Sequence, residues 1–140
     1  MNNKLTYDTL LKNKNDLELD FLKQTDRELW IRLHQVEIKN MKVNKDLPQI
    51  ELYFEDYICI HIDDERYVQY TPGFNGHLFR TYKKSAMLDY VKDKTIAIPY
   101  LKTSNNLSKS EELKLTHYEI CTMNSIISVV TENEPKVILI

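Results

Sequence analysis

Glycine and alanine are almost missing from this sequence. Gly73 and Gly76, with Ala86 and Ala97, are the only ones in 140 residues, whereas glycine alone usually makes up about 7% of a protein. Lys, Asn, Ile and Tyr, whose codons are AT-rich, take their place. The composition therefore indicates an AT-rich genome, such as that of a low-GC bacterium or of one of its phages or mobile elements.

The chain also lacks the marks of secreted and membrane proteins. Its two cysteines, Cys59 and Cys121, are too few and too far apart for a disulfide framework. Its longest apolar run is a few residues, far short of the roughly 20 that cross a bilayer. The first residues, MNNKLTYDTLL, do not follow the pattern of a secretory signal. We expect a cytoplasmic protein of a low-GC bacterial host, with both thiols free and no membrane partner.

The charge is small in sum and uneven along the chain. The net charge of −2 argues against general affinity for nucleic acid. Residues 1–65 carry 9 basic and 14 acidic side chains, and residues 66–140 carry 10 and 7. Between Arg66 and Lys102, seven basic residues face only Asp89 and Asp93. The second half is thus the cationic half of what we expect to be one domain, residues 1–140.

The hydrophobic pattern of the first third predicts helices. Thr25 and Glu28 match a capping box, the residue pair that closes the start of many helices. After them apolar residues recur at helical spacing: Leu29, Leu33 and Val36. Residues 4–23 are expected to be helical as well, although LELDFL (17–22) also alternates as a strand does. Residues 1–46 are therefore predicted to be mainly helical.

From Ile50 onward the pattern changes to the two-residue period of strands. Strands are expected near 50–62, 66–71, 77–83, 94–101, 125–131 and 136–140. Ser85 is a suitable N-cap for a short helix near 85–93, and residues 111–123 fit either a helix or a strand. The sequence therefore predicts an α+β fold, in which N-terminal helices pack on a mainly antiparallel sheet.

Both glycines stand in sequences typical of turns. TPGF fits a type II turn and FNGH a type I′ hairpin turn. A hairpin closed at Asn75–Gly76, together with a three-residue loop at Asp63–Glu65, places one set of residues on a single face of a sheet. The set is aromatic, polar and cationic: Tyr57, Cys59, His61, Tyr67, Gln69, Arg80, Tyr82 and Lys84. The opposite face is apolar and is expected to form the core.

This aromatic and cationic face is the candidate binding surface, because Tyr and Arg are enriched where proteins bind one another. The partner-binding residues that we predict are Tyr67, Gln69, Arg80, Tyr82 and Lys84. The function that we expect is a non-catalytic module that occludes a partner protein. An anti-defence inhibitor of a phage or mobile element, or a toxin-immunity protein, would be a concrete form. A binder of single-stranded RNA using the same face is the first alternative. A purely structural face, whose basic residues pair with the acids of 51–65, is also consistent with the pattern.

The remaining chemistry in the sequence is sparse. Cys59, His61 and Asp63 would share one face of a strand, and zinc accepts such ligands, but no second paired motif completes a site. We expect no metal and no cofactor. His61 oriented by Asp63 could act as a general base in a small hydrolase or nuclease, which is the second alternative. No nucleophile motif accompanies the pair, so we expect a protein that is not an enzyme.

Overall fold

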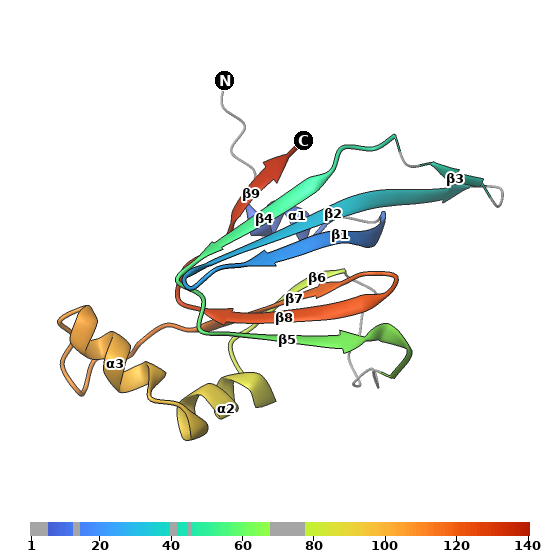
Figure 1. Cartoon of the computed structure of the whole chain (residues 1–140). Helices are drawn as coiled ribbons and strands as arrows, with labels where there is room; N and C mark the ends of the chain where they lie inside the picture. The colour runs from blue at the N-terminus through green and yellow to red at the C-terminus, as the bar shows by residue number, and fades with distance from the viewer. Residues whose placement is uncertain (1–5, 13–14, 40–41, 45, 68–77) are drawn as a thin grey trace.

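Two antiparallel sheets lie face to face in the computed structural model, which describes residues 6–12, 15–39, 42–44, 46–67 and 78–140 (Figure 1). One sheet has the strand order β1-β2-β4-β9, with β3 paired to β2, and the other has the order β5-β8-β7-β6. The strands are β1 (Asp16–Gln24), β2 (Glu28–Lys39), β3 (Lys42–Asn44), β4 (Ile50–Glu55), β5 (Cys59–Asp64), β6 (Phe79–Tyr82), β7 (Thr116–Cys121), β8 (Ser125–Thr131) and β9 (Lys136–Leu139). The helices are α1 (Tyr7–Leu10), α2 (Ala86–Lys94) and α3 (Ala97–Ser104), with a 3₁₀ turn at Glu65–Tyr67. The expected α+β class is confirmed.

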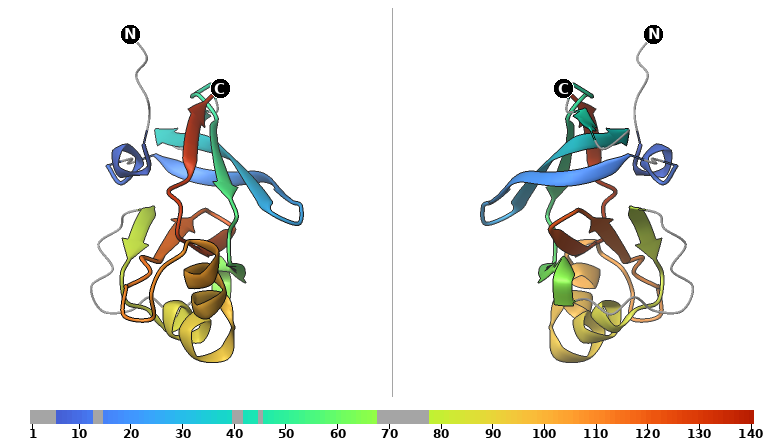
Figure 2. Two further views of the ribbon diagram at one scale, coloured as in Figure 1. Left: turned by 90° about the vertical axis from the view of Figure 1, so that its left-hand side faces the viewer. Right: turned by 90° about the vertical axis from the view of Figure 1, so that its right-hand side faces the viewer.

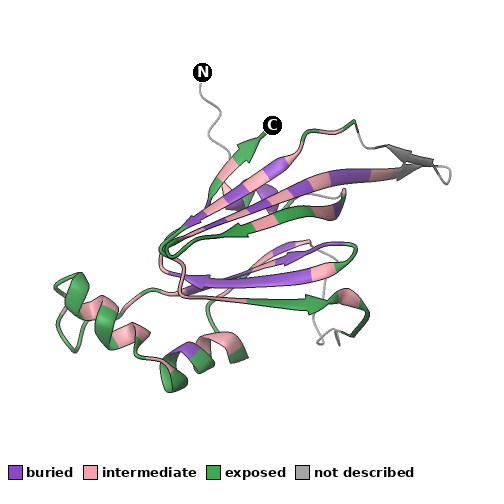
Figure 3. Cartoon of the chain, in the orientation of Figure 1, coloured by how far each residue is buried: buried purple, intermediate pink, exposed green. Residues whose placement is uncertain are grey.

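The core lies between the two sheets, because alternate residues of each sheet point toward the other. β2 and β4 contribute the upper layer and β7 and β8 the lower layer, and Figure 3 shows these strands as the most buried part of the chain. Fully buried examples are Leu29, Ile31, Leu52, Ile120 and Ile127. The inward faces are therefore committed to packing, and surfaces free for binding must lie on the outward faces, edges and helices.

The predicted helix after Thr25 is wrong, and so is a mainly helical segment 1–46. Residues 28–39 form β2, and residues 16–24 form β1, as the alternation of LELDFL had allowed. The Thr25 hydroxyl accepts a hydrogen bond from the Glu28 N–H at 3.2 Å, as it would in a capping box, but here it closes the turn between β1 and β2. The alternation of Leu29, Ile31 and Leu33 decided the outcome, since all three are fully buried on one face.

The predicted strand at 94–101 is also wrong, because residues 97–104 form α3. Pro99, which has no N–H to give to a sheet ladder, does not mark an edge strand. It is instead the third residue of this helix, where the missing N–H costs no hydrogen bond. The helix predicted near 85–93 is confirmed as α2, and the Ser85 hydroxyl caps it by accepting from the Leu88 N–H.

Three further strand predictions are confirmed: β6 for 77–83, β8 for 125–131 and β9 for 136–140. Residues 50–62 form two strands, which belong to different sheets. Residues 111–123, left open between helix and strand, contain β7. Of the strand expected at 66–71, the structure shows a 3₁₀ turn ending at Tyr67. The remaining residues lie outside the described ones, as do the two glycine turns.

Helices α2 and α3 lie on the outward side of the β5-β8-β7-β6 sheet, away from the sandwich core (Figures 1 and 2). They connect β6 to β7, the two neighbouring strands at one edge of that sheet. Only Val91 of the two helices is buried. The outward face of this sheet is thus partly covered, and the space beside α2 is open to ligands or partners.

Helix α1 closes the sandwich with its two buried side chains, Tyr7 and Leu10. The ring of Tyr7 is 1% exposed and makes edge contacts with Phe79 and Tyr118, at centroid distances of 5.7 and 4.8 Å. Its hydroxyl lies 3.1 Å from the carbonyl oxygen of Arg80 and 3.0 Å from that of Glu119, so it bridges β6 and β7. Burial raises the pKa of this phenol well above its ordinary value, so Tyr7 remains a neutral donor.

We predict that Tyr7→Phe lowers the free energy of unfolding by about 1–2 kcal/mol, because two buried carbonyls lose their shared donor while the ring stays in place. Urea unfolding followed by the fluorescence of Trp30, the only tryptophan, measures this change. The matched control is Tyr100→Phe on α3, where the side chain is 65% exposed. Equal stability of the Tyr7→Phe variant and the wild type would show that the hydroxyl does not hold α1 in place.

Candidate functional site

Candidate functional side chains of this chain lie on the outward face of the β5-β8-β7-β6 sheet. In the register of its strands, Arg80, Glu119, Ser128 and His61 form one row across the sheet. Tyr82, His117, Val130 and Cys59 form the next row. Cys59, His61, Arg80 and Tyr82 therefore share the face opposite the core, as predicted. They are spread over the width of the sheet, because β5 and β6 are its two edges. The three-residue loop predicted at Asp63–Glu65 is wrong, because Asp63 and Asp64 belong to β5.

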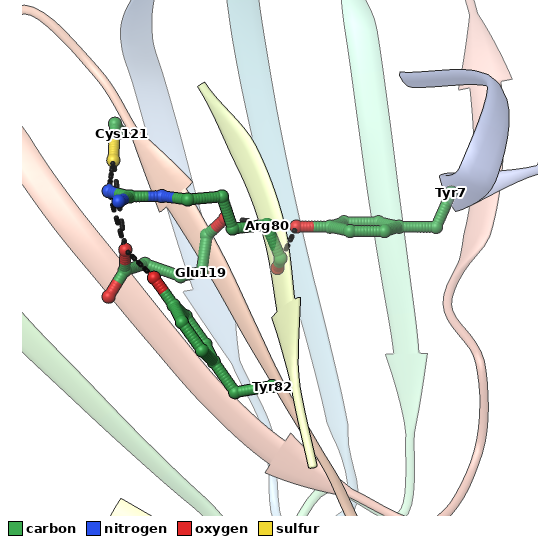
Figure 4. Close-up of polar contacts among 5 residues, drawn as sticks. All are labelled: Tyr7, Arg80, Tyr82, Glu119 and Cys121. Atoms are coloured by element: carbon green, nitrogen blue, oxygen red, sulfur yellow. Dashed lines mark hydrogen bonds and ion pairs between the residues drawn. The ribbon is translucent and has the colours of Figure 1, made fainter. Parts of the chain in front are cut away.

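Arg80 and Tyr82 are tied to Glu119 on the neighbouring strand (Figure 4). The Arg80 guanidinium lies 2.6 Å from Glu119 Oε1, and the Tyr82 hydroxyl donates to the same oxygen at 3.2 Å. A second contact of 2.8 Å joins Arg80 Nη2 to the sulfur of Cys121. The two charged side chains are only 14% and 17% exposed. Much of the cationic character expected of this face is thus neutralised within the sheet.

The structure does not bring the predicted partner-binding residues together in one patch. Tyr67 is 79% exposed in the 3₁₀ turn that follows β5, whereas Arg80 and Tyr82 lie on β6 at the opposite edge. Lys84 is exposed beyond the end of β6, just before α2. Gln69 lies outside the described residues.

A pocket of about 570 Å³ lies between this outward face and the start of α2. We call it the histidine pocket. It is lined by Cys59, Ile60, His61, Ser85, Ala86, Met87, Tyr90, His117 and Ser128. His117 is 7% exposed, and its Nδ1 lies 2.9 Å from the hydroxyl oxygen of Ser85. The hydroxyl that caps α2 is therefore also the one that holds the ring of His117.

Burial lowers the pKa of His117 from 6.5 to about 4, with smaller contributions from the positive charge of Arg80 and from His61. The imidazole is thus neutral at pH 7. Its Nε2 is buried and has no hydrogen-bond partner among the described residues. A neutral ring with one satisfied nitrogen and one unsatisfied nitrogen is unusual in a protein interior.

His61 lies at the rim of the same pocket, with Nε2 at 3.0 Å from the Asp63 carboxylate. This pair is the one that the sequence singled out as a possible general base. Within the described part of the chain, no hydroxyl or thiol lies in hydrogen-bond reach of His61. Burial raises the pKa values of Cys59 and Cys121, so neither thiol is an activated nucleophile. The described residues also contain no group of three His, Cys, Asp or Glu side chains able to hold a metal ion.

A second pocket, of about 810 Å³, opens on the other side of α2, and we call it the lysine pocket. It is lined by five lysines, two acids and four aliphatic residues: Lys83, Lys84, Lys92, Lys102, Lys114, Asp89, Glu112, Leu88, Ile98, Leu113 and Leu115. Two of the ammonium groups contact neutral oxygens. Lys83 donates to the Thr116 hydroxyl at 2.6 Å and Lys102 to a backbone carbonyl at 3.1 Å. No ion pair to any of the five lysines is formed within the described ranges.

Comparison with protein-family models, with curated proteins and with solved structures finds no match for this chain. No helix in the described part of the chain is long and apolar enough to cross a membrane. A functional hypothesis must therefore be built from the two pockets themselves.

Sequence reasoning missed His117 and Glu119, the residues that organise the outward face. Their partners, Ser85 and Arg80, are more than 30 residues away in the chain. The alternation of THYEIC, with His117, Glu119 and Cys121 on one side, is the available signal once residues 116–121 are taken as a strand.

We predict that His117 makes the fold less stable in mild acid. The unfolded chain binds a proton on this residue near pH 6.5, whereas the folded chain binds it only near pH 4, so stability falls as the pH decreases through this window. The expected loss is on the order of 2 kcal/mol, allowing for partial solvent screening. Urea unfolding between pH 7 and pH 4 measures it. His117→Asn should flatten the profile. An unchanged slope in His117→Asn would contradict the assignment.

We predict that Glu119→Gln destabilises the protein by about 1–3 kcal/mol, because Arg80 then keeps its charge in a largely buried position without its counterion. A double-mutant cycle with Arg80→Met isolates the coupling of the pair. The control is the same cycle in the exposed Arg66–Asp64 pair, Asp64→Asn with Arg66→Met, where solvent screens the charges and the coupling should be small. Coupling no larger than in that control would mean that the Arg80–Glu119 contact contributes no net stability.

Proposed function

We propose that this chain is a non-catalytic protein-binding module, which acts by covering a surface of a partner protein. The observation that carries the proposal is the lysine pocket, in which five lysines and four aliphatic side chains face two acids. A partner segment that combines acidic and apolar side chains fits this lining, because it offers counterions to the lysines and covers the aliphatic floor.

The surroundings of the pocket support a protein partner. Two large side chains of the helical segment that contributes Lys92, Ile98 and Lys102 to the pocket remain mostly exposed: Ile96 at 77% and Tyr100 at 65%. Tyrosine and aliphatic residues of this kind are more often found within protein interfaces than on surfaces that stay in water. The three-residue link from β6 to α2 also supplies Lys84, one of the residues predicted from the sequence to contact a partner.

The structure also supplies a reason to rank nucleic acid second. Arg80 is a cation of the face expected to bind RNA, and it is paired with Glu119. Tyr82, which would stack a base, donates to the same carboxylate. The apolar side chains that line the lysine pocket are all aliphatic, whereas a strand-binding groove would place aromatic rings there. The concrete form of the proposal remains an anti-defence inhibitor of a phage or mobile element, or a toxin-immunity protein.

A labelled 12-residue peptide of alternating Glu and Leu should bind the chain at low salt, and its analogue with Gln in place of Glu should not. Fluorescence polarisation measures both affinities. Lys84→Glu combined with Lys102→Glu should weaken binding about tenfold or more, because two attractive contacts become repulsive. The matched control, Lys12→Glu with Lys23→Glu, changes the net charge equally but away from the pocket, and should retain the affinity to within the effect of net charge.

A single-stranded oligonucleotide of equal charge serves as the competing probe. Tight binding that falls steeply with added salt, with no binding of the acidic peptide, would replace the proposal by the nucleic-acid alternative. A partner from a low-GC bacterial lysate should form adducts with a photo-crosslinker placed at Lys84 and not with one placed at Lys23, before and after nuclease treatment. Equal adducts from both positions would show that the pocket is not the docking site.

A further inference from the structure

We propose that the histidine pocket is a binding site for a small organic carboxylate, held by hydrogen-bond donors at the start of α2 and by Nε2 of His117. The site is separate from the lysine pocket. Ala86, Met87 and Tyr90 of α2 line the histidine pocket, whereas Leu88, Asp89 and Lys92 line the other one.

The first donor of the histidine pocket is Nε2 of His117. The Ser85 hydroxyl accepts the Leu88 N–H at 3.1 Å, and we assign its own proton to the contact with Nδ1 of His117. Nδ1 is then the acceptor, and the ring proton resides on Nε2. This N–H is buried and lacks an acceptor among the described residues. A buried donor of this kind costs free energy unless a ligand atom pairs with it.

The start of α2 adds donors to the same pocket. In a helix the first N–H groups have no intrahelical acceptor, and the Ser85 side chain satisfies only that of Leu88. The N–H groups of Ala86 and Met87, the first two residues of the helix, are left for an outside acceptor, and both residues line the pocket. The partial positive charge of a nine-residue helix at this end favours an anion.

The rest of the lining determines the kind of anion. The pocket wall contains no carboxylate, so nothing in the lining competes for the donors. Ile60, Met87 and Tyr90 supply an apolar and aromatic wall, and the volume of about 570 Å³ exceeds what an inorganic ion needs. A carboxylate head with an aromatic or aliphatic body matches both halves of the lining.

Benzoate is the test ligand and benzamide its neutral control of the same shape. We expect benzoate to shift the ¹⁵Nε2 resonance of His117 and the amide resonances of Ala86 and Met87 in a saturable NMR titration. Benzamide should bind at least about tenfold more weakly, because hydrogen bonds to a charged group are the stronger ones. Acetate should also bind at least about tenfold more weakly, since it lacks the ring that contacts the apolar wall. Equal affinity of benzoate with either control would overturn the proposal.

His117→Asn keeps an amide near the position of Nδ1 for Ser85 and removes Nε2, and should weaken benzoate binding about tenfold or more. His34→Gln, on the other sheet, should bind as the wild type does. If His117→Asn does not fold, Ala86→Trp provides the second test, because Ala86 is exposed on α2 and a large side chain there fills the pocket without removing a polar group. Unchanged benzoate affinity in a folded Ala86→Trp or His117→Asn variant would refute the site.

Discussion

The packing of two apolar sheet faces on each other is the constraint on which the rest of this structure depends. β2 and β4 on one side and β7 and β8 on the other bury nearly all of their inward side chains. The chain passes from one sheet to the other at residues 56–58 and 132–135. Tyr7 closes the same core, and its hydroxyl satisfies two carbonyls of β6 and β7 that face the interior. Since every inward position serves packing, specific chemistry is restricted to the outward faces.

The two outward faces differ in how completely their side chains cover one another. On the β1-β2-β4-β9 sheet, aromatic and charged residues cover one another: Trp30 packs on Tyr53 at 5.2 Å, with Lys23 over Trp30 and Lys136 over Tyr53. Such a face is complete without a partner. On the other sheet, Arg80 and Glu119 neutralise each other near β6, while α2 stands over the remainder and leaves a pocket on each of its sides. The asymmetry between the faces is what singles out α2 as the functional element.

How far the sequence could predict this arrangement depends on how local the determining contacts are. The alternation of CIHI and FRTY correctly placed Cys59, His61, Arg80 and Tyr82 on one outward face, because side-chain direction in a strand is a local property. The Thr25–Glu28 contact is local too and does form, but a capping geometry serves a turn as well as a helix. Strand order is not local. β5 and β6 flank β7 and β8, which follow them in the chain, so the partner of Arg80 and the neighbour of Ser85 could not be found from nearby residues.

The link between β6 and α2 shows how closely the two pockets are joined. Lys83 and Lys84 line one of them, and Ser85, the next residue, lines the other. Ser85 fixes the first turn of α2 through Leu88 and fixes the ring of His117 through Nδ1. The backbone of this link is therefore held by an N-cap on one side and, through Lys83, by the Thr116 hydroxyl of β7 on the other. The same hydrogen bonds hold Lys83 and Lys84 of this link, which we assign to a partner protein, and orient the unsatisfied nitrogen of His117. A substitution at Ser85 therefore alters both pockets.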